Sequence, residues 1–171
     1  VVRFHVLANS DSEADQALKL AVRDRVLQEY GDLLETCTSK EETLAALKNA
    51  QQEISETAEA EVLAQGYTYP VRVSLVREEF PFKKYGDLIF PAGVYDALRI
   101  EIGEAKGKNW WCVLYPQMCY VDAAWGYSTE ESHVRLQNTL TKEEFLVVSA
   151  MEQKKVTPKI KCRLVELWSE R

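Results

Sequence analysis

Two long apolar stripes at helical spacing, joined by the short linker "CTSK", constrain the fold of this chain most strongly. The first stripe consists of Leu18, Val22, Val26, Tyr30 and Leu33. This spacing predicts a helix from about Asp11 to about Leu34. The second stripe runs from Leu44 to Val62, and we expect Gly66 to end it. Because the linker is so short, the two helices are expected to form an antiparallel hairpin.

Both predicted helices begin with a capping pattern, a serine followed three residues later by glutamate. Ser10 precedes Glu13 in the first helix, and Ser39 precedes Glu42 in the second. Such a pair can satisfy the free backbone amides of a helix start. Asp11 adds a negative charge near the positive end of the first helix dipole.

Alternation with a period of two predicts strands on both sides of the helices. The expected strands are residues 1–8, residues 69–76 after the helical hairpin, and "NWWCVLYP" at 109–116. The proline of the last segment is expected to end that strand. "YGDLIF" at 85–90 and "YDALRIEI" at 95–102 flank the turn residues "PAGV", which predicts a β-hairpin.

The C-terminal part carries weaker helical signals. We expect a short helix at 130–136 and a second one, capped by Thr141 and Glu144, through about Gln153. The ending at 157–171 suits a helix or a strand, and the helix is favoured. The prediction is a single α+β domain over residues 1–171. A long N-terminal helical hairpin packs on a mostly antiparallel β-sheet, followed by a C-terminal helical and loop region.

Composition and charge exclude several classes of protein. The chain has 171 residues, 46% of them hydrophobic and 28% charged, which fits one globular domain. A formal charge of −6 without a basic cluster opposes a nucleic-acid or anionic-membrane partner. No apolar run is long enough to span a membrane. Because the chain begins with Val1 and not Met, we expect that an N-terminal segment has been removed.

The opening strand contains His5 and is followed directly by a cluster of Asn, Ser and Asp residues. This arrangement allows a catalytic or a structural interpretation. Catalysis needs a nucleophile and an orienting acid, for which Cys112, or Ser10 with Asp11, could be proposed. Equally, His5 can lie on a sheet face while the polar residues start the helix. A metal held by His5, Asp11 and Asp15 lacks a fourth ligand. We therefore predict no catalytic residue, cofactor or metal.

Glycines bound the segment "GEAKGKN" at 103–109, which has a superficial likeness to a phosphate loop. Three residues separate its glycines where four are needed, and Asn109 stands where a magnesium-binding Ser or Thr is required. The segment is therefore predicted to be a loop between two strands.

Adjacent tryptophans and two cysteines make residues 110–119 the most unusual stretch. Trp110 and Trp111 must point to opposite faces of a strand, so one can enter the core while the other is a candidate binding anchor. Pro116 lets the chain turn between Cys112 and Cys119. These cysteines could form a disulfide in an oxidising compartment or remain buried thiols in a reducing one.

Four separated segments resemble the stage II sporulation protein R family. They are "RFHVLANSDSEADQALKLAVRD" at 3–24, "YPVRVSL" at 69–75, "YGDLIFPAGVYDALRIEIG" at 85–103 and "GKNWWCVLYPQMCYVD" at 107–122. The likeness covers nearly the whole chain, with "KIKCRLVELW" as its diagnostic feature near the end.

The resemblance implies a signalling protein of endospore-forming bacteria and not an enzyme. Members are made in the forespore, exported by an N-terminal hydrophobic segment, and act between the two membranes of the sporangium. They trigger a membrane-embedded aspartic protease of the mother cell, which then cleaves a sigma factor precursor. Export also favours the bridge between Cys112 and Cys119. The use of Cys37 and Cys162 stays open.

An activator of this kind needs a rigid surface that favours the active state of its receptor. We place this surface where the strand-to-helix corner approaches the tryptophan strand. The candidate residues are Asn9, Ser10, Asp11, Asp15, Lys19, Trp110 and Trp111. Alternatively, Asn9 only forms a turn, and Asp15 and Lys19 form an exposed ion pair along the helix.

Two other functional classes compete with the signalling interpretation. One is an extracytoplasmic hydrolase that uses Cys112 or a serine with His5. The other is a structural protein of the septal space that acts by oligomerising.

Overall fold

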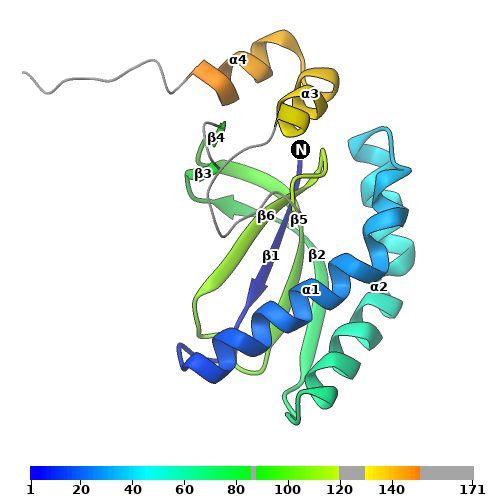
Figure 1. The fold of residues 1–171 in the computed structure, drawn as a ribbon, viewed down its shortest axis with the longest axis vertical. Helices are drawn as coiled ribbons and strands as arrows, with labels where there is room; N and C mark the ends of the chain where they lie inside the picture. The colour runs from blue at the N-terminus through cyan, green and yellow to red at the C-terminus, as the bar shows by residue number, and fades with distance from the viewer. Residues whose placement is uncertain (86–87, 120–129, 151–171) are drawn as a thin grey trace, which may run out of the picture.

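The computed structural model describes residues 1–85, 88–119 and 130–150. Its main layer is a four-stranded sheet with the strand order β2-β5-β1-β6, and two long helices cover one face of this sheet (Figure 1). The strands are β1 (Val2–Leu7), β2 (Val71–Phe80), β5 (Gly93–Ile102) and β6 (Asn109–Tyr115). Only β1 and β5 run parallel, which confirms the predicted α+β fold with a mostly antiparallel sheet.

The predicted helical hairpin is confirmed. Helices α1 (Glu13–Glu35) and α2 (Lys40–Ala64) lie against each other, and the Tyr30 hydroxyl is 3.1 Å from the Thr57 hydroxyl between them. Their buried apolar side chains pack on the side chains of β1 that point to this face, Val2, Phe4 and Val6. The assignment of Leu33 to the first stripe is wrong, because Leu33 is 41% exposed and Leu34 is buried in its place. Gly66 has φ +84°, a conformation that glycine adopts readily, and it follows the end of α2 as expected.

One predicted helix cap is confirmed and the other is wrong. Ser39 caps α2, and its hydroxyl accepts the Glu42 amide hydrogen at 3.1 Å. The cap of α1 is Ser12, whose hydroxyl accepts the Asp15 amide hydrogen at 3.1 Å, and not Ser10. Ser10 instead donates its hydroxyl proton to the Asp15 carboxylate at 2.5 Å, so the helix begins two residues later than its pattern indicated.

The predicted hairpin around "PAGV" is also wrong. Strand β4 (Leu88–Phe90) pairs with β3 (Lys83–Tyr85), whereas β5 pairs over its whole length with β2. The three-residue β4 could give β5 only a few backbone hydrogen bonds, and the long ladder with β2 offers many more. Residues 91–92 therefore lead from one sheet into the other.

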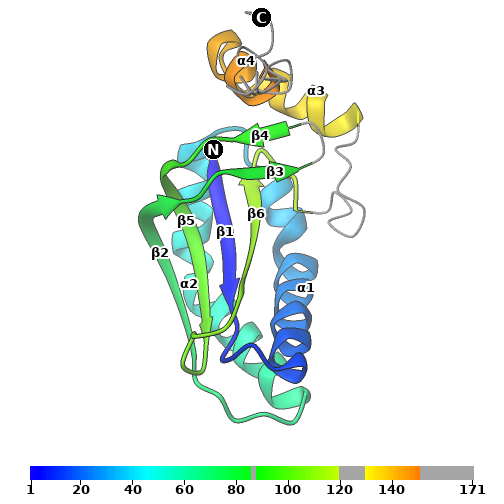
Figure 2. The same cartoon turned by 90° about the vertical axis from the view of Figure 1, so that its left-hand side faces the viewer.

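A smaller second core lies beyond the N-terminal end of β1. Helices α3 (Glu130–Thr139) and α4 (Lys142–Ala150) sit at this end together with β3 and β4 (Figure 2). The buried residues of this core are Leu88, Phe90, Val113, Met118, Leu136 and Val148. Both predicted helices are confirmed, and Thr141 and Glu144 cap α4 reciprocally at 3.2 and 2.9 Å.

The predicted continuation to Gln153 and the predicted helix at 157–171 lie outside the described residues. Within the described ranges, no helix combines the length and the apolar character that crossing a membrane requires.

Replacing the α2 cap should destabilise the helical hairpin. We expect Ser39→Ala to lower the free energy of unfolding by about 1 kcal/mol, because the Glu42 amide loses its partner. Ser39→Gly should lower the free energy of unfolding by only roughly a few tenths of a kcal/mol, since glycine leaves this amide open to water. Equilibrium urea unfolding measures both values, and equal losses for the two variants would contradict the capping role.

Candidate functional site

The face of the sheet opposite the helical hairpin carries an unusual set of polar side chains. Ser74, Arg99, His5 and Trp111 are neighbours in one row across the four strands. We call the group that surrounds this row the polar face, and its members are His5, Arg72, Ser74, Glu78, Arg99, Glu101, Asn109 and Trp111. Figure 2 shows this side of the sheet, with α2 behind the strands.

His5 is buried at the centre of the polar face with only 3% of its surface exposed. Its ring stacks on Trp111 at 5.0 Å between ring centroids, and Phe80 packs against it edge to face at 5.3 Å. The Nδ1 atom lies 2.8 Å from the Asn109 side-chain amide nitrogen, and Nε2 lies 2.6 Å from a Glu78 carboxylate oxygen. Both ring nitrogens therefore face groups of the protein itself.

His5 is neutral at pH 7. Burial lowers the pKa of its imidazole to about 4, and the nearby cation of Arg99 adds to this effect. With Nδ1 accepting a hydrogen from the Asn109 amide, the single ring proton sits on Nε2 and faces the Glu78 carboxylate.

Charged side chains continue the polar face toward the outer strand. Arg99 lies between Glu78 at 3.1 Å and Glu101 at 3.5 Å, and Arg72 reaches the same Glu101 carboxylate at 3.3 Å. Glu78, Arg99 and Glu101 are partly buried, whereas 77% of the Arg72 side chain is exposed. The network thus begins inside the protein and ends in solvent.

Arg3 lies one row away from His5 and is completely buried. Its guanidinium is surrounded by the rings of Phe80, Tyr85, Phe90 and Tyr95 at 5.0 to 5.7 Å, and it donates to the Tyr85 hydroxyl at 3.0 Å. Burial lowers the pKa of Arg3. These cation–π contacts hold β3 and β4 on the sheet. The period of two that places Arg3 and His5 on the same face of β1 is the sequence signal for this polar side of the sheet.

The strand-to-helix corner, by contrast, is bonded to a distant loop of the same chain. The Asn9 side-chain oxygen accepts the Glu104 amide hydrogen at 2.9 Å, and Asp11 accepts that of Lys108 at 2.6 Å. Both bonds tie the corner to the glycine-bounded loop at 103–108. A Cβ atom on Gly103 would lie 2.3 Å from the Asn9 oxygen, which explains why glycine is needed there.

The expected exposed ion pair of Asp15 and Lys19 is wrong, because the two residues are only 4% and 5% exposed. Asp15 accepts hydrogen bonds from Ser10 and Asn9, which lower the pKa of its carboxyl group. Lys19 donates to the Lys108 carbonyl at 3.1 Å, and burial lowers the pKa of its ammonium group.

The two tryptophans point to opposite faces, as predicted. Trp110 packs edge to face on Phe4, with the Arg23 guanidinium of α1 at 4.7 Å from its ring centroid. Trp111 lies on the polar face beside His5, and the Lys83 ammonium is 5.2 Å from its ring centroid. The structure brings the corner to the start of the tryptophan strand, where Asp11 and Lys19 bond to Lys108. Trp111 lies on the polar face, and Trp110 lies on the opposite face of the sheet.

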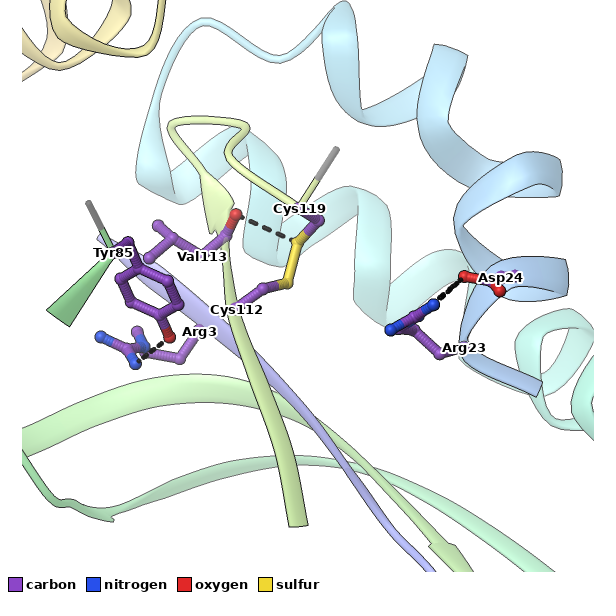
Figure 3. The surroundings of a disulfide bond; sticks show 7 residues. All are labelled: Arg3, Arg23, Asp24, Tyr85, Cys112, Val113 and Cys119. Carbon is purple, nitrogen blue, oxygen red and sulfur yellow. Dashed lines mark hydrogen bonds and ion pairs between the residues drawn. A yellow bond between two sulfur atoms is a disulfide. The ribbon is translucent and has the colours of Figure 1, made fainter. Parts of the chain in front are cut away.

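A disulfide joins Cys112 to Cys119, with the two Cα atoms 5.3 Å apart. It fixes the turn that follows β6, and Figure 3 shows it on the side of the strands away from the Arg3–Tyr85 pair. The Met118 amide donates to the Val113 carbonyl at 3.0 Å within the same turn. Cys37 is a free, partly exposed thiol at the end of α1.

The arrangement opposes the hydrolase interpretation. Cys112 pairs with Phe4 in the ladder, so its side chain points away from the face of His5, and its sulfur is in the disulfide. Ser74 shares the face of His5 but lies two strands away, about 10 Å at the usual strand spacing. Within the described residues, no cluster of three His, Cys, Asp or Glu side chains could hold a metal.

These features define an α+β domain in which a disulfide joins Cys112 to Cys119 and the described residues hold no metal-binding cluster. The family model of stage II sporulation protein R matches residues 1–125. The stage II sporulation protein R of Bacillus subtilis (strain 168) is 32% identical over 179 residues, covering 99% of this chain and 80% of the relative. No solved structure matches. The chain belongs to the stage II sporulation protein R family, and its role is in sporulation.

The close approach of Gly103 to Asn9 can be tested with a matched glycine. Gly103 and Gly66 both have positive φ, +60° and +84°, but only Gly103 faces a side chain within 4 Å. We expect Gly66→Ala to cost about 1 kcal/mol of unfolding free energy and Gly103→Ala about 2–3 kcal/mol. Urea titration gives both values. Equal losses would mean that the 103–108 loop does not depend on its contact with the corner.

The buried His5 should make the fold sensitive to mild acid. Its folded pKa of about 4 lies below the unfolded value near 6.5, so the unfolded chain binds a proton first. Stability is therefore full above about pH 6.5 and falls as the pH drops toward 4, by on the order of 1–3 kcal/mol. In His5→Gln, urea midpoints measured from pH 7 to 4 should fall less steeply than in the wild type. Parallel curves would contradict the assignment.

Proposed function

We propose that this domain is an exported sporulation signal that acts in the space between the forespore and mother-cell membranes. It is made in the forespore and activates a membrane-embedded aspartic protease of the mother cell. The protease then cleaves the inactive precursor of a sigma factor. Membership of the stage II sporulation protein R family is the observation that carries this proposal.

The geometry of the polar face supports a ligand and not a catalyst. His5 is neutral, its two ring nitrogens face Asn109 and Glu78, and Cys112 points to the other face. A protein of this kind acts through binding energy. It must bind the active state of its receptor more tightly than the inactive state, since equal affinity for both states changes nothing.

The scaffold has the stiffness that such a ligand needs. β1 is paired on both sides, its buried face packs on two long helices, and the disulfide holds the turn after β6. A disulfide also suits an oxidising, extracytoplasmic compartment. A rigid surface binds without a large ordering cost, which leaves more binding energy to shift the receptor equilibrium.

Reconstitution tests this function directly. The protease and a tagged sigma factor precursor are placed in lipid vesicles, with the extracytoplasmic part of the protease outward and the precursor inside. Adding the purified domain outside should start precursor cleavage in a dose-dependent way. A protease whose catalytic aspartate is replaced by asparagine is the control and should give none.

Two outcomes would overturn the proposal. Precursor cleavage at the same rate with and without the domain would remove the activating role. Cleavage of the precursor by the domain when the two are mixed in solution without the protease would instead indicate a hydrolase.

A further inference from the structure

We propose that the polar face is the surface that contacts the receptor, and that it binds an extended, acidic segment of the receptor's extracytoplasmic part. This inference rests on the proposed function. It replaces the strand-to-helix corner as the candidate contact surface, because the side chains of the corner are already bonded within the protein.

Unpaired polar atoms concentrate on the polar face. The Nε and Nη1 atoms of Arg3, one row away from His5, also lack a hydrogen-bond partner among the described residues. On the polar face itself, the Ser74 hydroxyl, the Arg99 Nε atom and the Asn109 side-chain oxygen are buried and have no such partner within the described ranges. They come from three different strands, β2, β5 and β6, yet all lie in or beside the row that contains His5. Buried polar atoms without partners are costly and rare in folded proteins. These atoms are covered in the structure, so a bound segment would pair with them only after the side chains above them shift.

The local charge favours an acidic partner. The chain as a whole has a formal charge of −6. Around the polar face, however, the cations of Arg72, Arg99 and Lys83 outnumber the carboxylates of Glu78 and Glu101 while His5 is neutral. An acidic segment is therefore attracted to the polar face although the chain as a whole is acidic, which favours orientation as well as affinity.

Trp111 supplies the apolar anchor of the surface. Its ring is held between His5, Phe80 and Lys83 and is partly exposed. Because these neighbours fix the ring, binding would cost little side-chain entropy. Tryptophan and arginine together are the residue types that most often dominate binding energy at protein interfaces.

Arg72 is the group best placed to meet an incoming carboxylate. Its only described partner, Glu101, is shared with Arg99, and most of its side chain is exposed. Lys83 lies over the ring of Trp111 on β6, which is three strands away from Arg72 on β2. A chain segment laid across the strands from Trp111 to Arg72 would thus meet a cation at each end, which commits the occupant to an extended peptide and not to a single ion.

Charge reversal at these two positions tests the surface. The receptor protease, purified in detergent micelles, is titrated with the wild-type domain and with the double variant Arg72→Glu, Lys83→Glu. The matched control is Arg25→Glu, Lys48→Glu, which reverses two exposed cations on the helical hairpin. We expect the polar-face variant to lose about tenfold or more in affinity and the control to stay within about twofold of wild type. Thermal unfolding of each variant checks that the fold is kept.

A second titration tests the acidic nature of the occupant. Acidic residues in the extracytoplasmic loops of the receptor are replaced by their amides, one loop at a time. Replacement in the contacting loop should weaken binding of the wild-type domain. It should leave binding of the polar-face variant nearly unchanged, because that variant has already lost the cations that attract the loop carboxylates. Salt should weaken wild-type binding more than binding of the variant.

The outcomes separate this inference from the proposed function. If the wild-type domain binds and activates the protease but the polar-face variant does so equally well, the surface is wrong and the function stands. The surface is also wrong if the helical-hairpin control loses as much affinity. If no receptor loop shows the coupling, the acidic occupant is wrong. If the wild-type domain neither binds nor activates the protease, the proposed function fails and this inference fails with it.

Discussion

The alternation of side chains along β1 is the constraint on which the rest of the structure depends. Val2, Phe4 and Val6 point to the helical hairpin, and Arg3 and His5 point to the other face. Because β1 is paired on both sides, it lies inside the sheet, and each of its faces contributes to a different side of the protein. The apolar face packs against α1 and α2. The opposite face needs partners for a buried cation and a buried imidazole, and the aromatic rings around Arg3 and the Glu78 and Asn109 side chains provide them.

Features encoded by local sequence were predictable. The two helices, their hairpin, the first strand and the opposite orientations of Trp110 and Trp111 follow from periodicity and capping over short distances. Strand pairing was not predictable in the same way. β5 pairs with β2 and β1, and nothing near "PAGV" indicates this choice, because it depends on which long ladder satisfies most backbone groups.

The surroundings of the candidate contact residues depend on the same level of organisation. Asp15 and Lys19 have the spacing of an exposed ion pair, but Asp15 accepts from Asn9 and Ser10, and Lys19 donates to the Lys108 carbonyl in the loop at 103–108. That loop is almost a hundred residues away in the sequence, and its glycines gave no hint of the contact with Asn9. Likewise, the polar face is assembled from four strands, so no continuous stretch of sequence contains it.

The central position of β1 also bears on how the chain acquires its structure. β1 precedes the other described strands in the sequence, whereas both of its neighbours come from residues 93–115. Contacts this distant in the sequence form slowly and late. The central strand of the sheet therefore stays incompletely paired until the polypeptide through Tyr115 is available, so folding of the sheet depends on a segment far downstream.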